Sequence, residues 1–207
     1  TKYNHSGVPM DRPGHYLYLR DMESGEYWSA SWQPVMRDMQ EYECRHGMGY
    51  TTIKGKYADI SSRVTYFIPD GKNYEVWKAA VRNDSDRPRT LRYMEFSFYD
   101  AMTDMLQEWS RYFSDCYWKD GSIIYDPSNE LSDYERQYTF MTSSLPAVGY
   151  ECQRRAFLGD YRDESNPIGV ERGSLTSTDV NADYVCGSIC CEITLGPGEE
   201  KEFIYAI

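Results

Sequence analysis

The chain has 207 residues, of which 41% are hydrophobic, so it can bury a sizeable core, and we expect a single domain over residues 1–207. Its formal net charge is -11 and its pI is about 4.8. This acidity disfavours nucleic acids and anionic membranes as partners, because both attract clustered Lys and Arg side chains.

The first half of the chain predicts short strands joined by tight turns. Residues 1–13 are rich in Gly, Pro and polar side chains and indicate a loop. Period-two alternation is clearest over 57–69 and 90–99, which is typical of strands. We expect consecutive antiparallel hairpins built from strands at 15–20, from Tyr27, and over 48–53, 57–69, 74–82 and 90–99. The turns between them are expected at 21–25, 54–56, 69–72 and 83–88.

The pattern changes after Asp100. Residues 101–109 predict either two helical turns or a long excursion from the sheet, and loops that leave a rigid sheet are where binding residues concentrate. A polar insertion is expected over 126–133 and a long ordered loop over 158–183. Further strands are expected near Tyr117 and over 122–125, 137–142, 150–157, 186–195 and 202–207, with a hairpin at 196–200. Strands at this spacing indicate a large antiparallel sandwich.

The segment Gly25–Tyr50 combines two tryptophans with a compact polar group. Trp28 and Trp32 precede the run Glu43-Cys44-Arg45-His46-Gly47, which lies between apolar and aromatic residues. Polar groups inside a sheet core must pair with one another. We therefore expect Trp28, Trp32, Glu43, Arg45 and His46 to form a buried structural network rather than a ligand site.

Aromatic residues make up 15% of the chain, including 20 Tyr and 5 Trp. Flat aromatic faces with polar rims suit sugar rings, whereas abundant tyrosine also suits plain β-structure. Composition alone leaves both interpretations open.

The cysteines Cys44, Cys116, Cys152, Cys186, Cys190 and Cys191 match no zinc-site spacing. Cys190 and Cys191 are adjacent, so they should point to opposite faces of a sheet. No signal peptide or membrane-spanning apolar run is recognised. We therefore expect reduced thiols, mostly small core residues, in a cytoplasmic protein without a resident metal or cofactor.

No catalytic motif can be recognised from spacing. The histidines His5, His15 and His46 stand in no nucleophile motif, and HExxH-type metal sites and Gly-rich phosphate loops are absent from the sequence. With 33 acidic residues, pairs of carboxylates at useful spacing occur by chance. Residue patterns therefore predict an acidic, aromatic-rich β-sandwich without assigning a reaction.

Several segments together resemble a known family. They are GHYLYLRD (14–21), GEYWSASWQPV (25–35), YECRHG (42–47), GYT (49–51), YFIP (66–69), EVW (75–77), NDSD (83–86), RAFLG (155–159) and LGPGEEKEF (195–203). They resemble the N-terminal domain of the inverting glycoside phosphorylases of the cellobiose and cellodextrin phosphorylase group. The resemblance covers essentially the whole chain.

This resemblance implies a β-supersandwich of two large antiparallel sheets, like that of galactose mutarotase. In such enzymes a helical linker and an (α/α)6 barrel follow, and the barrel holds the catalytic aspartate and the phosphate pocket. The reaction is reversible phosphorolysis with inversion, in which an aspartic acid protonates the glycosidic oxygen while phosphate attacks the anomeric carbon. The chain also begins without Met and ends in a strand-like stretch, so we expect a piece of a longer enzyme that lacks the catalytic residue.

The resemblance further implies dimerisation and a loop that reaches the partner subunit's active site. The segment 107–113 falls where family members carry this loop, and Arg111 matches an arginine there. A guanidinium can donate fixed hydrogen bonds to a sugar hydroxyl or a leaving group. Trp109 and Tyr112 differ from the pattern of cellobiose phosphorylase, which affects the expected acceptor. A surface salt bridge of Arg111 with Asp104 or Glu108 is the alternative.

Two other functions remain open. A free-standing carbohydrate-binding module would require an exposed aromatic platform. A mutarotase-like epimerase would require a His and a Glu facing each other in a cleft, for example His15 or His46 with Glu43. Glu43 and His46 are three residues apart on one strand, so their side chains should face opposite ways.

Overall fold

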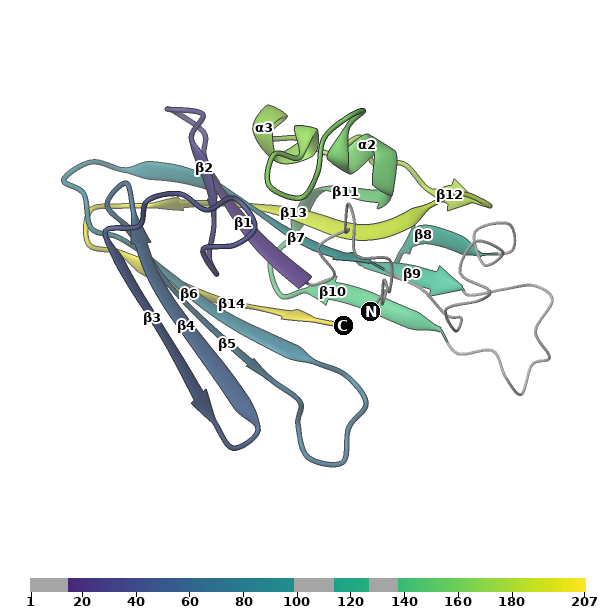
Figure 1. The fold of residues 1–207 in the computed structure, drawn as a ribbon, viewed down its shortest axis with the longest axis horizontal. Helices are drawn as coiled ribbons and strands as arrows, with labels where there is room; N and C mark the ends of the chain where they lie inside the picture. Colours follow the sequence, from purple (N-terminus) through teal and green to yellow (C-terminus); the bar gives the residue numbers. More distant parts are fainter. Residues whose placement is uncertain (1–14, 99–113, 127–137) are drawn as a thin grey trace.

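The computed structural model describes residues 15–98, 114–126 and 138–207 (Figure 1). The described strands form two antiparallel sheets, which confirms the predicted all-β sandwich. The five-stranded sheet has the order β11-β13-β7-β1-β2. Its strands are β1 (His15–Asp21), β2 (Tyr27–Ser29), β7 (Arg89–Phe98), β11 (Ala147–Gln153) and β13 (Val185–Leu195).

The nine-stranded sheet has the order β12-β8-β9-β10-β14-β6-β5-β4-β3. Figure 1 shows β3 as the outermost strand at one edge of this sheet. The strands are β3 (Glu41–Gly47), β4 (Tyr50–Tyr57), β5 (Ile60–Phe67), β6 (Val76–Asn83), β8 (Asp115–Lys119), β9 (Ser122–Asp126), β10 (Thr139–Ser143), β12 (Val180–Asn181) and β14 (Glu200–Ala206).

The main core lies between the two sheets, where alternate residues of facing strands meet. Leu91 and Tyr93 of β7 contribute to it from the five-stranded sheet, and Phe203 of β14 from the nine-stranded one. The rings of Tyr93 and Phe203 meet edge to face with centroids 4.7 Å apart, an arrangement that aromatic pairs favour. Strand β7 is also buried on its other face, so its period-two pattern does not separate a solvated face from a covered one.

A second apolar cluster covers the outer face of the five-stranded sheet. It includes α2 (Arg154–Leu158) and α3 (Ile168–Arg172), which lie together over this sheet in Figure 1. The ring of Phe157 from α2 stacks on Phe96 of β7 at a centroid distance of 4.3 Å. The strand predicted over 150–157 is therefore wrong after Gln153, because Phe157 and Leu158 turn inward from a helix instead of continuing the sheet.

Two predicted hairpins are wrong because the chain changes sheet at those turns. Strands β6 and β7 belong to different sheets, and so do β13 and β14. The buried Asn83 lies at both crossings, where its amide nitrogen donates to the carbonyl oxygens of Arg87, Leu195 and Gly196. Turn residues signal that the chain reverses, but they do not indicate which strand becomes its partner.

The turn predicted at 54–56 lies inside β4, and the connection to β5 is Ala58-Asp59, both with positive φ. Gly55 is required for a different reason. A Cβ at Gly55 would lie 2.5 Å from the methyl carbon of Met39, so the glycine lets Met39 pack directly on the strand. A glycine in a strand can mark close packing rather than a turn.

The six cysteines are free thiols, and five of them are buried while Cys44 is exposed. Cys190 and Cys191 belong to the two different apolar clusters, which confirms that they point to opposite faces of the sheet. Burial raises the pKa of the Cys186 and Cys190 thiols, the latter to about 12. In the part of the chain that the structure describes, no helix is long and apolar enough to cross a membrane.

Candidate functional site

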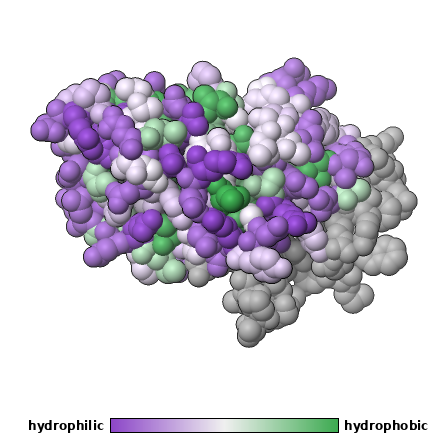
Figure 2. All heavy atoms as spheres, turned by 90° about the horizontal axis from the view of Figure 1, so that it is seen from above, coloured by the Kyte–Doolittle hydropathy of each residue, from purple (hydrophilic) through white to green (hydrophobic). Residues whose placement is uncertain are grey.

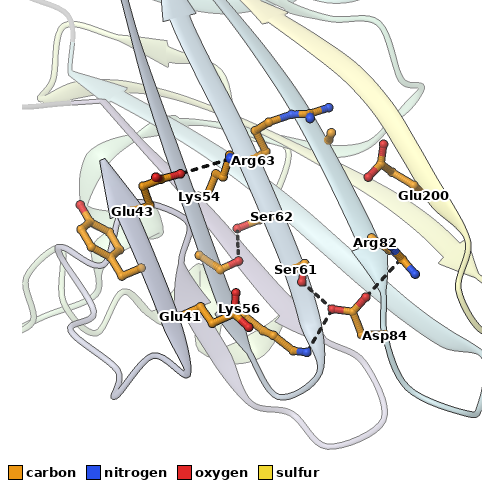
Figure 3. A pocket seen from close by; sticks show the side chains of 13 residues that line it. Glu41, Glu43, Lys54, Lys56, Ser61, Ser62, Arg63, Arg82, Asp84 and Glu200 are labelled. Atoms are coloured by element: carbon orange, nitrogen blue, oxygen red, sulfur yellow. Dashed lines mark hydrogen bonds and ion pairs between the residues drawn. The ribbon is translucent and has the colours of Figure 1, made fainter. Parts of the chain in front are cut away.

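A polar groove of about 540 Å³ lies on the outer face of the nine-stranded sheet, across β3, β4, β5, β6 and β14. Residues in cross-strand register line it, so side chains of neighbouring strands stand side by side (Figure 3). One such row is Glu41, Lys56, Ser61, Arg82 and Glu200. The adjacent row begins with Glu43, Lys54 and Arg63.

The charges in the groove are largely neutralised by one another. Glu43 accepts hydrogen bonds from Arg45, at 2.8 Å from its Nε, and its other oxygen lies 3.1 Å from Nζ of Lys54. These hydrogen bonds lower the pKa of Glu43. The side chains remain substantially exposed, so each pair contributes little to stability.

Asp84 occupies the other end of the groove. It accepts a hydrogen bond from Ser61 and lies 3.3 Å from Nζ of Lys56 and 3.2 Å from Nε of Arg82 (Figure 3). Partial burial opposes ionisation, but these donors outweigh it and lower the pKa of Asp84. The groove therefore presents fixed, alternating charges and hydroxyls that suit a polar ligand or another protein surface, without an activated nucleophile among its lining residues.

A second group of titratable side chains lies where β1 meets the start of β6. Nδ1 of His15 is 3.6 Å from Oε2 of Glu75, and the His15 ring lies 5.4 Å from that of Trp77. The interaction with His15 lowers the pKa of Glu75. Glu95 is fully buried on β7, and this burial raises its pKa well above the usual range. His15 is thus paired with Glu75, not with Glu43 as an epimerase site would require.

The buried Glu95 has a single identified partner. Ser97 donates a hydrogen bond to its Oε1 at 2.9 Å, and Oε2 has no hydrogen-bond partner in the described structure. A protonated carboxyl is far cheaper to bury than a carboxylate. Glu95 was not singled out from the sequence, because an acidic residue on the inward face of a strand carries no local signal of its burial.

The two tryptophans of the Gly25–Tyr50 segment differ completely in environment. Trp28 is fully buried and its ring lies 5.1 Å from that of Tyr57. Trp32 is 42% exposed, so the expected burial of Trp32 is wrong. It follows β2 in a loop, where its backbone has a φ of 64° and its carbonyl accepts a hydrogen bond from Ser29.

The polar residues of the same segment lie on an exposed strand, so the expected burial of Glu43, Arg45 and His46 is also wrong. All three belong to β3, the edge strand. The pairing among them is local. Glu43 bonds Arg45 on one face, whereas Nδ1 of His46 lies 2.9 Å from the hydroxyl of Thr51 on the other. Glu43 and His46 face opposite ways, in agreement with the sequence argument.

The residues predicted to contact substrate, Trp109, Arg111 and Tyr112, lie outside the described residues. Within residues 15–98, 114–126 and 138–207, no group of three His, Cys, Asp or Glu side chains could hold a metal ion. Exposed aromatic side chains occur at separate places, including Tyr42 on β3 and Tyr138 and Tyr161 outside the strands and helices. The face seen in Figure 2 is mainly hydrophilic, with separate small apolar spots instead of one flat platform.

The fold and the residue pattern place this chain among the supersandwich domains of carbohydrate-active enzymes. A family profile described as "Glycosyl hydrolase 94, supersandwich domain" matches residues 1–207. The chain belongs to this family, which confirms the resemblance to the N-terminal domains of glycoside phosphorylases.

Individual relatives support the same assignment. N,N'-diacetylchitobiose phosphorylase from Vibrio proteolyticus is 40% identical over an alignment that covers 100% of this chain and 26% of the relative. The enzyme of the same name from Vibrio furnissii is 39% identical over 93% of this chain and 25% of the relative. Solabiose phosphorylase from Paenibacillus borealis is 32% identical over 91% of this chain and 25% of the relative. The chain thus spans about a quarter of the length of the curated relatives it matches.

Proposed function

We propose that this chain is the N-terminal domain of an inverting phosphorylase that cleaves a β-linked disaccharide with inorganic phosphate. The observation that carries the proposal is the match of the supersandwich profile over residues 1–207, together with relatives that are named as phosphorylases. The relatives are about four times longer, which supports a catalytic barrel in the same polypeptide.

The chemistry of this proposal assigns the reacting groups to that barrel. An aspartic acid protonates the glycosidic oxygen, and phosphate attacks the anomeric carbon from the opposite face of the ring. Phosphate is a co-substrate, and no other cofactor is required. The groove of the present domain supports this division of labour, since Glu43 and Asp84 are paired with Lys and Arg side chains and their pKa values are lowered, which suits ion pairing and not proton donation.

Two kinds of sugar are candidates for the substrate. The family resemblance favours cellobiose or a cellodextrin, which would give α-glucose 1-phosphate. The two relatives with 39 and 40% identity are named for N,N'-diacetylchitobiose, whose phosphorolysis would give N-acetylglucosamine 1-phosphate. We favour the second substrate, because identity over the whole chain is higher for these relatives than for solabiose phosphorylase.

The domain itself is proposed to support dimerisation and to place Trp109, Arg111 and Tyr112 near the sugar bound by the partner subunit. The enzyme is proposed to work in the cytoplasm, where its free thiols stay reduced. A free-standing sugar-binding module is the alternative, and the exposed rings of Trp32 and Tyr42 are the feature that favours it.

The test is a sugar 1-phosphate assay on the full-length gene product with N,N'-diacetylchitobiose, cellobiose and cellotriose. We expect product from the chitobiose that depends strictly on added phosphate, and in the same assay Arg111→Ala should lower turnover without altering the melting temperature. Release of glucose 1-phosphate from cellobiose would reverse the substrate choice. Hydrolysis without phosphate, or no reaction with any of the sugars, would refute the proposed phosphorylase.

A further inference from the structure

The ring of Tyr50 lies flat against Gly47 on the outer face of the nine-stranded sheet. The two residues are partners in register where β3 meets β4, and period two puts Tyr50 on the same side as Lys54 in the groove. A Cβ at Gly47 would lie 2.3, 2.4 and 2.8 Å from Cε1, Cζ and Oη of Tyr50, so the glycine is under the face of the ring and not at its edge. The glycine makes room for the ring, and Tyr50 remains 49% exposed on its other side.

Polar side chains lead from this ring along β4 into the groove. Two residues beyond Tyr50, the hydroxyl of Thr52 lies 3.0 Å from that of Thr65. Lys54 and Lys56 follow at the same spacing and line the groove (Figure 3). From Tyr50 to Lys56 the strand extends about 20 Å. The ring, the two threonines and the groove therefore form one continuous surface, hereafter the Tyr50 strip, which suits an extended chain.

The charged side chains that line the groove balance one another. Four are acidic and four are basic, namely Glu41, Glu43, Asp84, Glu200, Lys54, Lys56, Arg63 and Arg82. Ion pairs hold several of them in place, as with Glu43 and Lys54 at 3.1 Å. The groove therefore offers hydrogen-bond donors and acceptors at fixed positions without a net charge. This balance favours a neutral ligand whose groups both donate and accept hydrogen bonds.

An exposed aromatic face beside such a groove is complementary to a sugar chain. One side of a pyranose ring carries C–H groups that pack on an aromatic face, and its hydroxyls both donate and accept hydrogen bonds. A protein partner matches the strip less well, because the centre of a protein interface is usually depleted in charged residues. The charged side chains of the groove lie in the middle of this surface (Figure 3).

We propose that the Tyr50 strip is a binding site for a neutral oligosaccharide. One pyranose ring stacks on the exposed face of Tyr50, and the hydroxyls of the following units form hydrogen bonds with Thr52, Thr65 and the paired charges of the groove. The strip holds the chain without reacting with it, because Glu43 and Asp84 are engaged in ion pairs. The inference is drawn from this face alone and does not depend on the reaction proposed above.

Calorimetric titration of the full-length protein with chitotetraose and with cellotetraose tests the site. Phosphate is left out, so that phosphorolysis consumes neither sugar. We expect Tyr50→Ala to weaken binding of at least one tetrasaccharide by about five- to tenfold, whereas Tyr50→Phe keeps the ring and should bind as the parent does. Gly47→Ala should act like Tyr50→Ala, because its Cβ would displace the ring. Tyr161→Ala is the matched control, since it removes another exposed tyrosine from the loop between α2 and α3.

The second readout uses the unmodified protein and is independent of how the variants fold. A saturating tetrasaccharide should slow amide hydrogen exchange over residues 41–67 and leave α2 and α3 unchanged. The affinity should change little with added salt, because the ligand carries no charge.

The inference is overturned if neither tetrasaccharide binds, or if Tyr50→Ala and Gly47→Ala bind as the parent does. It is also overturned if exchange over 41–67 does not respond to the sugar, which is the result expected where another protein surface covers this face. These outcomes leave the proposed function intact, because sugar 1-phosphate release is measured separately. Binding at Tyr50 in a protein that releases no sugar 1-phosphate would support the inference and refute only the phosphorylase.

Discussion

Trp28 and Trp32 are four residues apart, yet the side chain of one is buried and that of the other is exposed. Trp28 lies in the covered centre of the sandwich, where β1 and β7 face β5, β6 and β14, and it is fully buried. Trp32 lies in the loop that leads to the β3–β4 hairpin, and it is 42% exposed. The hairpin belongs to the larger sheet, but its inward-facing Tyr42 remains 50% exposed.

The comparison shows that coverage by the opposite sheet, and not the residue pattern, decides burial. The larger sheet has nine described strands and the smaller has five, so the two cannot cover each other completely. In the covered centre, apolar area removed from water stabilises the fold. On the hairpin, the aromatic side chains of Tyr42 and Tyr50 stay about half exposed and contribute less.

The largest effect expected from this comparison is the loss of Trp28. Trp28→Ala should lower the free energy of unfolding by about 3 to 5 kcal/mol, because it leaves a cavity beside Tyr57 in the main core. Trp32→Ala is the matched control and should cost less than about 1 kcal/mol. Denaturant unfolding of both variants measures the difference. Equal losses would show that Trp32 is also part of the core.

A smaller loss is expected from Asn83, which connects the two crossings between the sheets. Asn83→Ala removes the hydrogen bonds that the buried side-chain amide donates to the carbonyl oxygens of Leu195 and Gly196. The expected cost is about 2 to 3 kcal/mol in the free energy of unfolding. Ser85→Ala is the control, because it removes only the hydroxyl that donates to Asn83. A loss no larger than that of the control would contradict the role of Asn83.

A third effect concerns Glu95 and depends on pH. Because burial raises its pKa in the folded state, Glu95 keeps its proton at pH values where the unfolded chain releases it. Its contribution is therefore fully present below the unfolded pKa of about 4.3 and is lost as the pH rises above that value. The slope for one proton is at most about 1.4 kcal/mol per pH unit.

Glu95→Gln should remove this slope and make the protein more stable than the parent at neutral pH. Unfolding measurements at several pH values between about 4 and 7 would test it, since this window lies above the unfolded pKa. Ser97→Ala retains the carboxyl and should retain the slope. Parallel stability curves for the parent and Glu95→Gln would mean that Glu95 is ionised in the folded protein.

Much of the fold follows from local patterns. The predictions that failed depend on contacts between residues far apart in the sequence. The alternation over 57–69 and 90–99 correctly predicted β5 and β7, and the adjacency of Cys190 and Cys191 correctly predicted their opposite faces. The predicted hairpins at 83–88 and 196–200 failed because strand partners are set by tertiary packing. The sequence predicts a turn at Gly55 because a glycine that makes room for Met39 cannot be told from a turn glycine by residue type.

The candidate site was harder to predict because burial and register determine it. The polar residues of 42–47 suggested a buried network, since they stand among apolar and aromatic residues, but no local signal indicates that β3 is an edge strand. The groove depends on register, which brings Glu43, Lys54 and Arg63 together from separate strands. The family resemblance predicts the class of protein correctly, whereas two relatives with 39 and 40% identity are named for N,N'-diacetylchitobiose and not for cellobiose.

The most direct test of the difference between the covered centre and the edge strand is amide hydrogen exchange of the full-length protein. The amides of β7 and β13 should exchange slowly, because these strands are central and covered on both faces. The account predicts much faster exchange of the β3 amides, because β3 has one neighbouring strand and six exposed residues. Exchange of β3 as slow as that of β7 would contradict the account.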